Sequence, residues 1–308
     1  MATDRRPGRT GPVTEAPTLR PLGVGDIVDR VFTLYRARPL LFLTLAAIPY
    51  LTLALALGAL AIPFAPTFIA LAPLLSAAEP PAIDRVVDAA IGVGSFLLIA
   101  VLVAIVVFAV QSAALVDAAA ARYLGREATV GASFRAGLGV SGRLVLAGIA
   151  VFVALIAVPM ALIIGAALTG AALVVIAAAL AALAAFFYLV ASWMVVPVVV
   201  TLEPVGPIAA LRRSWSLSSG SRWRVLGLVA LLTVLQVVLT TLFSFVFLSA
   251  FVADDLVRTV LQQAANLAAS IAWAPVQWGT FTLLYYDLRV RKEALDLQLA
   301  AEALPREP

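Results

Sequence analysis

The sequence predicts an all-α integral membrane protein with six transmembrane helices and short helices at the membrane interface. Two features of composition indicate this class. Of 308 residues, 63% are hydrophobic and only 12% are charged, whereas soluble domains are about half apolar and about a quarter charged. The third observation is that the apolar residues fall in long blocks, and about 20 consecutive apolar residues cross a bilayer as a helix.

Six blocks reach this length, and none of them contains Asp, Glu, Lys or Arg. They are residues 40–62, 91–116, 144–168, 171–200, 225–252 and 264–286. The strands of a membrane barrel would alternate in polarity over about ten residues, and these blocks show no alternation. Together they predict one six-helix membrane domain over residues 21–287.

Two connections between the blocks carry specific expectations. Pro63 to Ala90 holds an apolar stretch that is too short to span and is interrupted by Pro66 and Pro73. We therefore expect an interfacial or re-entrant loop there. The third and fourth blocks are separated by little more than Thr169 and Gly170, which predicts a tight antiparallel hairpin.

The distribution of arginine predicts the orientation. Of the 21 Lys and Arg residues, only Arg85 and Arg258 fall on the side opposite to the chain ends. Positive residues in short loops stay in the cytoplasm, so both termini are predicted to be cytoplasmic. Residues 1–20 are rich in Pro, Gly, Thr and Arg, which predicts a disordered tail. Residues 288–308 are expected to form a cytoplasmic C-terminal helix and tail.

Basic residues at the ends of the blocks are expected to contact the anionic inner leaflet of a bacterial cytoplasmic membrane. The last block ends at such a boundary. Tyr285 and Tyr286 suit the headgroup level, and charged residues follow them at once. Asp287 with Arg291, and Arg289 with Glu293, also form opposite-charge pairs four residues apart. The predicted anionic-lipid contacts are Arg36, Arg38, Arg143, Arg222, Arg224, Arg289, Arg291 and Lys292.

A weak repeat precedes the odd-numbered blocks. Short segments with a Val, a nearby Gly and arginines begin at Val24, Val130 and Val205. The first places its apolar residues on one helical face, a pattern suited to the membrane interface. The sequence therefore predicts three units, each a surface helix followed by a transmembrane hairpin.

The chain contains no Cys and no His, which excludes disulfides, thiolate nucleophiles, imidazole bases and the common zinc-ligand sets. Asp26 and Asp29 come closest to a metal cluster, but acidic residues in the first turn of a helix also complement its dipole. We expect no enzymatic activity, no cofactor and no bound metal.

The expected partners are membrane lipids. A small-residue face of Ala177, Ala181 and Ala185 would also suit self-association or a protein partner. The basic loops lack an aromatic stacking platform, so nucleic acid is not expected as a partner.

Polar residues inside the blocks leave two interpretations open. Gln111, Gln236 and Gln277 can hydrogen-bond between helices, which fits a lipid-associated or protein-interaction component of the membrane. Alternatively these amides and Trp273, beside the helix-distorting Pro275, line a cavity. That arrangement fits a transporter or channel-like protein for a small neutral or amphipathic molecule. A packed interior with an apolar groove would favour the first interpretation.

Three segments carry a family resemblance. They read LGVGDIVDRVFTLYRARP from Leu22, EPVGPIAALRRSWSLSSGSRWRVLG from Glu203 and LLYYDLRVRKEALDLQL from Leu283. With them the chain, from about Leu19 onward, resembles the membrane domain family named for glycerophosphoryl diester phosphodiesterase. Some members of that family carry a soluble catalytic barrel with histidines and metal-binding carboxylates. The resemblance implies a stand-alone, multi-pass bacterial membrane domain without that barrel.

Overall fold

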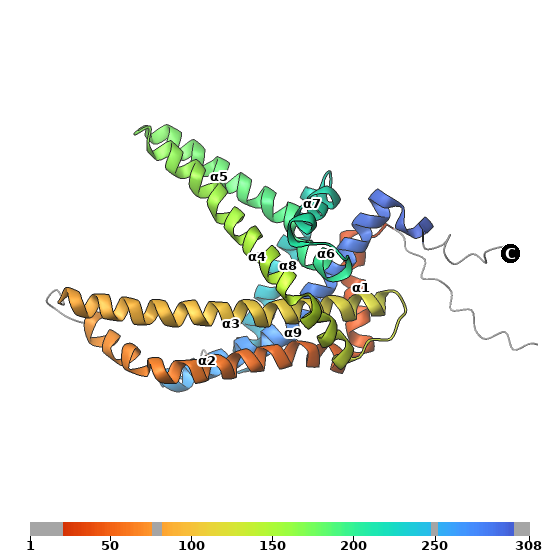
Figure 1. Cartoon of the computed structure of the whole chain (residues 1–308). Helices are drawn as coiled ribbons and strands as arrows, with labels where there is room; N and C mark the ends of the chain where they lie inside the picture. Colours follow the sequence, from red (N-terminus) through yellow and green to blue (C-terminus); the bar gives the residue numbers. More distant parts are fainter. Residues whose placement is uncertain (1–20, 76–81, 248–251, 299–308) are drawn as a thin grey trace, which may run out of the picture.

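The computed structural model describes residues 21–75, 82–247 and 252–298, and these residues form helices without any strand. Figure 1 shows their arrangement. The helices are α1 (Val24–Ala37), α2 (Pro39–Leu75), α3 (Ile83–Tyr123), α4 (Val130–Ala167), α5 (Ala172–Trp193), α6 (Val196–Leu202), α7 (Pro207–Ser218), α8 (Arg222–Val246) and α9 (Asp255–Glu293). The predicted tail at residues 1–20 and the last residues, 299–308, lie outside the described part of the chain.

The predicted all-α membrane class is confirmed. Five segments of the described chain are long and apolar enough to cross a membrane, namely Pro39–Leu71, Ile83–Tyr123, Val130–Ala167, Ala172–Leu202 and Arg222–Val246. They correspond to the first five predicted blocks.

The sixth predicted span lies within α9, a continuous helix of 39 residues that is about 58 Å long at 1.5 Å per residue. α9 is more polar than the five segments, and it lies at the centre of the bundle in contact with α1, α2, α3, α6, α7 and α8. Because protein rather than lipid covers much of this helix, it can carry residues such as Asn266 and Gln277 at a lower cost. The exact count of six spans stays a prediction.

The long helices of the described chain form three helical hairpins, α2–α3, α4–α5 and α8–α9. α1, α6, α7, the loop 124–129 and the last turns of α9 gather at one end of the bundle, which we call the basic end (Figure 1). α2–α3 and α4–α5 diverge from one another away from the basic end. α1 and α7 are separate helices ahead of the first and third hairpins. The segment from Val130 is instead the beginning of α4 itself.

The expected loop at Pro63–Ala90 is wrong. α2 continues as a helix through Pro63, Pro66 and Pro73 to Leu75, and α3 begins at Ile83. Each proline removes one backbone donor, but an unwound segment against lipid would leave many more backbone groups without partners. The helix also packs against α3, where Phe96 meets the rings of α2 at centroid distances of 5.0 to 5.6 Å.

The predicted hairpin at Thr169 and Gly170 is confirmed. α4 ends at Ala167 and α5 begins at Ala172. Gly170 has a φ of 67°, in the left-handed region that favours glycine. The turn therefore reverses the chain within a few residues.

The predicted span at residues 171–200 is one apolar segment long enough to cross a membrane, but its helix has a break at residues 194–195. α5 ends at Trp193 and α6 begins at Val196. Pro197 accounts for the break, because its ring clashes with the carbonyl four residues earlier, that of Trp193. The break turns the five valines from Val195 to Val200 into the centre of the bundle, where each is at most 2% exposed.

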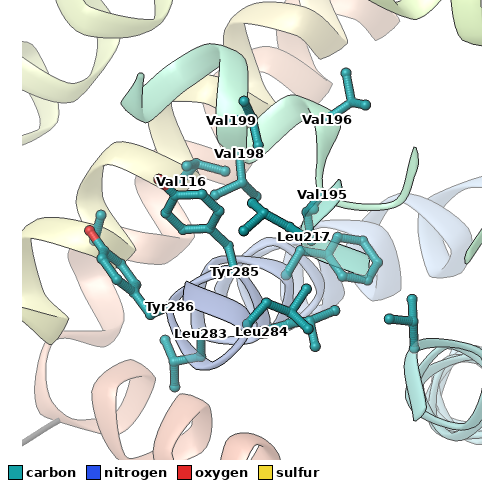
Figure 2. Packing of buried hydrophobic residues seen from close by; sticks show 14 of the residues in the cluster. Val116, Val195, Val196, Val198, Val199, Leu217, Leu283, Leu284, Tyr285 and Tyr286 are labelled. Atoms are coloured by element: carbon teal, nitrogen blue, oxygen red, sulfur yellow. The ribbon is translucent and has the colours of Figure 1, made fainter. Parts of the chain in front are cut away.

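The main core lies at the basic end. Figure 2 shows the valines of α6 packed around Leu283, Leu284 and Tyr285 of α9. The amphipathic α1 joins this core through Ile27 and Val31, which are both buried. α1 is thus packed on protein along its apolar face.

Candidate functional site

An apolar cavity opens where the α2–α3 and α4–α5 hairpins diverge. It has two adjoining lobes, of about 470 Å³ between α3 and α4 and about 400 Å³ between α4, α5 and α9. α6 and α9 contribute to both lobes. We call the two lobes together the fork. Their shared lining residues are Leu144, Gly148, Phe152, Pro197 and Trp278.

The lining of the fork is apolar almost throughout. Val101 and Phe108 on α3 and Phe152 on α4 are exposed, whereas Ala109 and Leu144 beside them are buried. The exposed residues belong to helices that are apolar enough to cross a membrane. In a bilayer, the open side of the fork would therefore meet hydrocarbon rather than water.

Two glycines of α4 set the local geometry of the fork. A Cβ atom on Gly137 would lie 2.8 Å from the carbonyl oxygen of Val110, so α4 crosses α3 at very short range there. Gly148 lies beyond the crossing and lines both lobes, and a Cβ atom built on it meets no other atom within 4 Å. The two helices meet at the first glycine and leave open space at the second.

The four residues predicted to line a cavity lie in different places. Gln277 borders the fork. Gln111 is buried, and its side-chain amide donates to the carbonyl of Ala46 at 3.0 Å, which links α3 to α2. Gln236 is exposed on α8. Trp273 is buried in α9, and its indole N–H has no hydrogen-bond partner within the described residues.

At the basic end, a buried carboxylate ties the start of the described chain to its last helix. The Leu22 N–H donates to Oδ1 of Asp287 at 2.7 Å, and Arg224 and Arg291 donate to Oδ2 at 2.5 and 3.0 Å. Both arginines also donate to the Leu22 carbonyl. The Asp287 side chain is fully buried. We call this arrangement the Leu22 clasp.

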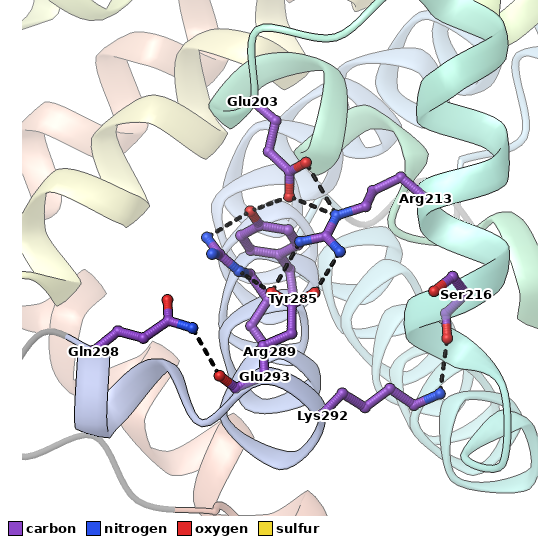
Figure 3. A network of polar contacts seen from close by, with 8 residues as sticks. All are labelled: Glu203, Arg213, Ser216, Tyr285, Arg289, Lys292, Glu293 and Gln298. Atoms are coloured by element: carbon purple, nitrogen blue, oxygen red, sulfur yellow. Dashed lines mark hydrogen bonds and ion pairs between the residues drawn. The ribbon is translucent and has the colours of Figure 1, made fainter.

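A second network joins α6, α7 and α9 (Figure 3). Arg213 donates through Nε to the carboxylate of Glu203 at 3.1 Å and also pairs with Glu293. The Tyr285 hydroxyl donates to Glu203 at 2.8 Å, and Arg289 donates to Glu293 at 2.9 Å. We call these five residues the Arg213 network.

The charges of the Arg213 network stabilise one another. Hydrogen bonding from Arg213 holds the pKa of the Glu293 carboxyl below its ordinary value, and Arg289 contributes in the same direction. The same bond to Glu293 raises the pKa of Arg213. Both groups therefore stay charged near neutral pH, and the network contributes to holding α7 against α9.

The residues predicted to contact anionic lipid divide into exposed and internally bonded groups. Arg36 and Arg38 are exposed at the end of α1. Arg143 donates to the Val205 carbonyl at 3.0 Å, and Lys292 donates to the Ser216 carbonyl at 2.7 Å.

The remaining four have closer partners. Arg224 and Arg291 belong to the Leu22 clasp, and Arg289 belongs to the Arg213 network. Arg222 is stacked on two aromatic rings. Most of these side chains thus have protein partners, of which only the pairs of Arg291 with Asp287 and of Arg289 with Glu293 were predicted.

Glu203 and Arg213 were not predicted as partners of one another. One signal was available, because Glu203 and Asp287 are single acidic residues in strongly basic or apolar surroundings. Isolated carboxylates next to a membrane are costly unless they are paired. Their presence indicates nearby arginines, although it does not identify them.

Two acidic residues act as helix caps. Asp26 accepts from the Gly23 N–H at 2.9 Å and caps α1, while Asp254 accepts from the Val257 N–H at 2.9 Å and caps α9. In the part of the chain that the structure describes, no group of three or more acidic side chains is placed to hold a metal ion.

The fold and the fork define a multi-pass, all-α membrane protein with an apolar lateral cavity. No family model, no curated protein and no solved structure matches this chain. The resemblance to the membrane domain family stays a prediction.

Proposed function

We propose that the protein is a non-enzymatic, lipid-associated component of the bacterial cytoplasmic membrane that holds a hydrocarbon chain of a membrane lipid in the fork. The observation that carries this proposal is the apolar lining of the fork, which opens between helices apolar enough to cross a membrane. Its lobes fall within the range of about 300 to 1,000 Å³ that is typical of ligand sites.

The packing of the molecule supports the same function. The basic end is held together by the valine-rich core, the Leu22 clasp and the Arg213 network. The two diverging hairpins expose large apolar side chains instead. A rigid base with an open apolar fork suits a bound lipid chain, because the base fixes the separation of the walls.

The proposal places the basic end in the cytoplasm. The basic end carries Arg36, Arg38 and Arg126, which are exposed, and Arg135 is exposed in the first turns of α4, which follow the loop 124–129. Positive residues of this kind favour the cytoplasmic side and attract anionic lipid.

We further propose that the chain belongs to the membrane domain family named for glycerophosphoryl diester phosphodiesterase, as a member without a catalytic barrel. The support is that the three resembling segments supply every side chain of the Leu22 clasp and of the Arg213 network. Leu22 comes from the first, Glu203, Arg213 and Arg224 come from the second, and the α9 residues come from the third.

Photo-crosslinking tests the fork. The purified protein is reconstituted with a phospholipid that carries a diazirine at mid-chain, and the crosslinked peptides are mapped. We expect crosslinks at Trp278 and at Phe281, which is only 3% exposed and is reached through the cavity. Gly148→Phe should fill the fork and reduce these crosslinks several-fold, since its side chain enters open space.

The matched control is Gly165→Phe on the same helix. A Cβ on Gly165 also meets no atom within 4 Å, and Gly165 is not among the lining residues of the two lobes. It should leave the crosslinks unchanged. Crosslinks confined to the outer faces of the hairpins, or unaffected by Gly148→Phe, would show that no chain enters the fork.

A transporter for a small neutral or amphipathic molecule is the second candidate. The observation that favours it is Gln277, an amide at the edge of an otherwise apolar cavity. Flux of such a solute into proteoliposomes, lost in Gln277→Leu, would support transport. Equal flux in empty and protein-containing liposomes would count against it.

A further inference from the structure

Arg222, at the start of α8, lies against two aromatic rings that contact one another edge to face. The carbon at the centre of its guanidinium lies 4.4 Å from the ring centroid of Tyr188 and 5.0 Å from that of Trp215. Its Nε donates to the hydroxyl of Ser192 at 2.8 Å. Ser192 in turn donates to the carbonyl of Tyr188 at 2.7 Å. The arginine is therefore fixed in orientation by contacts from α5 and α7.

The terminal nitrogens of Arg222 remain available. Within residues 21–75, 82–247 and 252–298, no carboxylate pairs with Arg222 and no group accepts from its two terminal nitrogens. Arg213, Arg224, Arg289 and Arg291 each pair with a carboxylate instead. Arg222 is thus a preorganised cation whose bonding edge has no protein partner in the described chain.

The surroundings of Arg222 correspond to the level of lipid headgroups. Tyr188 is 45% exposed, Trp215 is 37% exposed and the neighbouring Trp223 is 87% exposed. Tryptophan and tyrosine concentrate where the membrane meets water. From Val225 onward α8 is apolar enough to cross a membrane, so Arg222 marks the end of a span.

The Arg222 cluster adjoins the fork through one side chain. Trp193 follows Ser192 on α5 and lines the lobe of about 400 Å³, and its ring centroid lies 5.9 Å from that of Trp215. Tyr188 lies two positions from Val190, a fork residue of α5, and residues two apart on a helix point about 200° away from one another. Tyr188 therefore faces away from Val190, and Arg222 itself is not among the lining residues of the two lobes.

We propose that Arg222 binds the phosphate group of a membrane phospholipid headgroup. A guanidinium can donate two parallel hydrogen bonds to a phosphate, and these charge-assisted bonds are stronger than neutral ones. Stacking on Tyr188 and Trp215 reduces the conformational freedom that Arg222 would lose on binding, which favours affinity. A phosphate diester at the membrane surface matches both the chemistry and the depth of the site.

Native mass spectrometry of the detergent-solubilised protein tests this site with two lipids of the same acyl chains, phosphatidylglycerol and diacylglycerol. We expect Arg222→Gln to weaken phosphatidylglycerol binding about tenfold, the size of one charge-assisted interaction. Binding of diacylglycerol, which has no phosphate, should not change. Arg212→Gln is the control for charge, because Arg212 is exposed on α7, and it should change the affinity less than twofold.

Several outcomes would overturn the proposal. Equal effects of Arg222→Gln and Arg212→Gln would show that only net charge matters, and equal loss of both lipids would show a structural role. Displacement of phosphatidylglycerol by excess inorganic phosphate would assign the site to a free anion. If Arg222→Gln does not fold, Arg222→Lys decides, because it keeps the charge but loses the paired hydrogen bonds and should still weaken phosphatidylglycerol binding several-fold. In a protein that also carries Gly148→Phe, Arg222→Gln should weaken phosphatidylglycerol binding by the same factor.

Discussion

At the scale of single residues, Asp287 has the most partners of any acidic side chain in the described chain. It accepts one backbone N–H and bonds to two arginines while fully buried. A buried carboxylate is costly to desolvate, and here each of its oxygens has a partner. The clasp therefore depends on this side chain keeping its charge.

Replacing Asp287 with Asn should destabilise the protein by about 3 kcal/mol, because two partly buried arginines lose their counter-charge while the side-chain shape is kept. The measurement is the free energy of unfolding from a titration with SDS in mixed micelles. Asp255→Asn is the matched control, since Asp255 pairs with Arg258 but its side chain is 87% exposed. The control should cost at most about 1 kcal/mol. An equal loss of unfolding free energy in both variants would show that the Leu22 clasp does not stabilise the protein.

Residue contacts could be predicted from the sequence only within one helix. The pairs Asp287 with Arg291 and Arg289 with Glu293 are confirmed at 3.0 and 2.9 Å, because spacing of four residues fixes their proximity on a helix. Leu22, Arg224 and Arg213 approach α9 from other elements. No local spacing encodes such contacts, so Arg224 was expected to contact lipid and Arg213 was given no partner.

At the scale of elements, the contrast between prolines is informative. Pro197 lies in the first turn of α6, just after the break that ends α5, whereas Pro63, Pro66 and Pro73 lie within α2. Around Pro197, breaking the helix allows buried valines to pack against α3, α4 and α9. A break in α2 would bury no comparable set of side chains, and lipid would not satisfy the backbone groups that the break would free. Composition alone does not separate these cases, because packing decides between them.

The crossing of α3 and α4 should depend on Gly137. Gly137→Ala places a methyl group 2.8 Å from the Val110 carbonyl and 3.2 Å from the Ala114 nitrogen, both of which are backbone atoms that cannot rotate away. We expect a loss of about 1 to 3 kcal/mol, as for overpacking elsewhere, measured by the same SDS titration.

Gly139→Ala on the same helix supplies the comparison. No atom lies within 4 Å of its added Cβ, and alanine is the better helix former by up to about 1 kcal/mol. Gly139→Ala should therefore be neutral or stabilising. A stable Gly137→Ala variant would show that the two helices can separate without cost.

At the scale of the whole molecule, the apolar blocks predicted the class and most of the helices. Periodicity and length are strong signals for long apolar helices. The divergence of the hairpins could not be predicted, because it follows from where α4 crosses α3 and from the turn at α6. The fork is a product of that arrangement rather than of any motif.

The orientation can be tested with a single label, because the chain contains no cysteine. Ser219→Cys reports on the basic end, and Thr169→Cys reports on the tip of the α4–α5 hairpin. Both positions are exposed. In intact cells a membrane-impermeant maleimide should label only Thr169→Cys, since arginine-rich segments are retained inside. Labelling of Ser219→Cys before lysis would reverse the proposed orientation.

The Leu22 clasp has a consequence for anything attached to this protein. By bonding Leu22 to Asp287, it brings the beginning of the described chain beside the exit of α9. Whatever is attached ahead of Leu22 and after α9 therefore leaves the described chain at the same end of the bundle. Two such attachments would raise one another's effective concentration, although the path between them crosses the whole bundle.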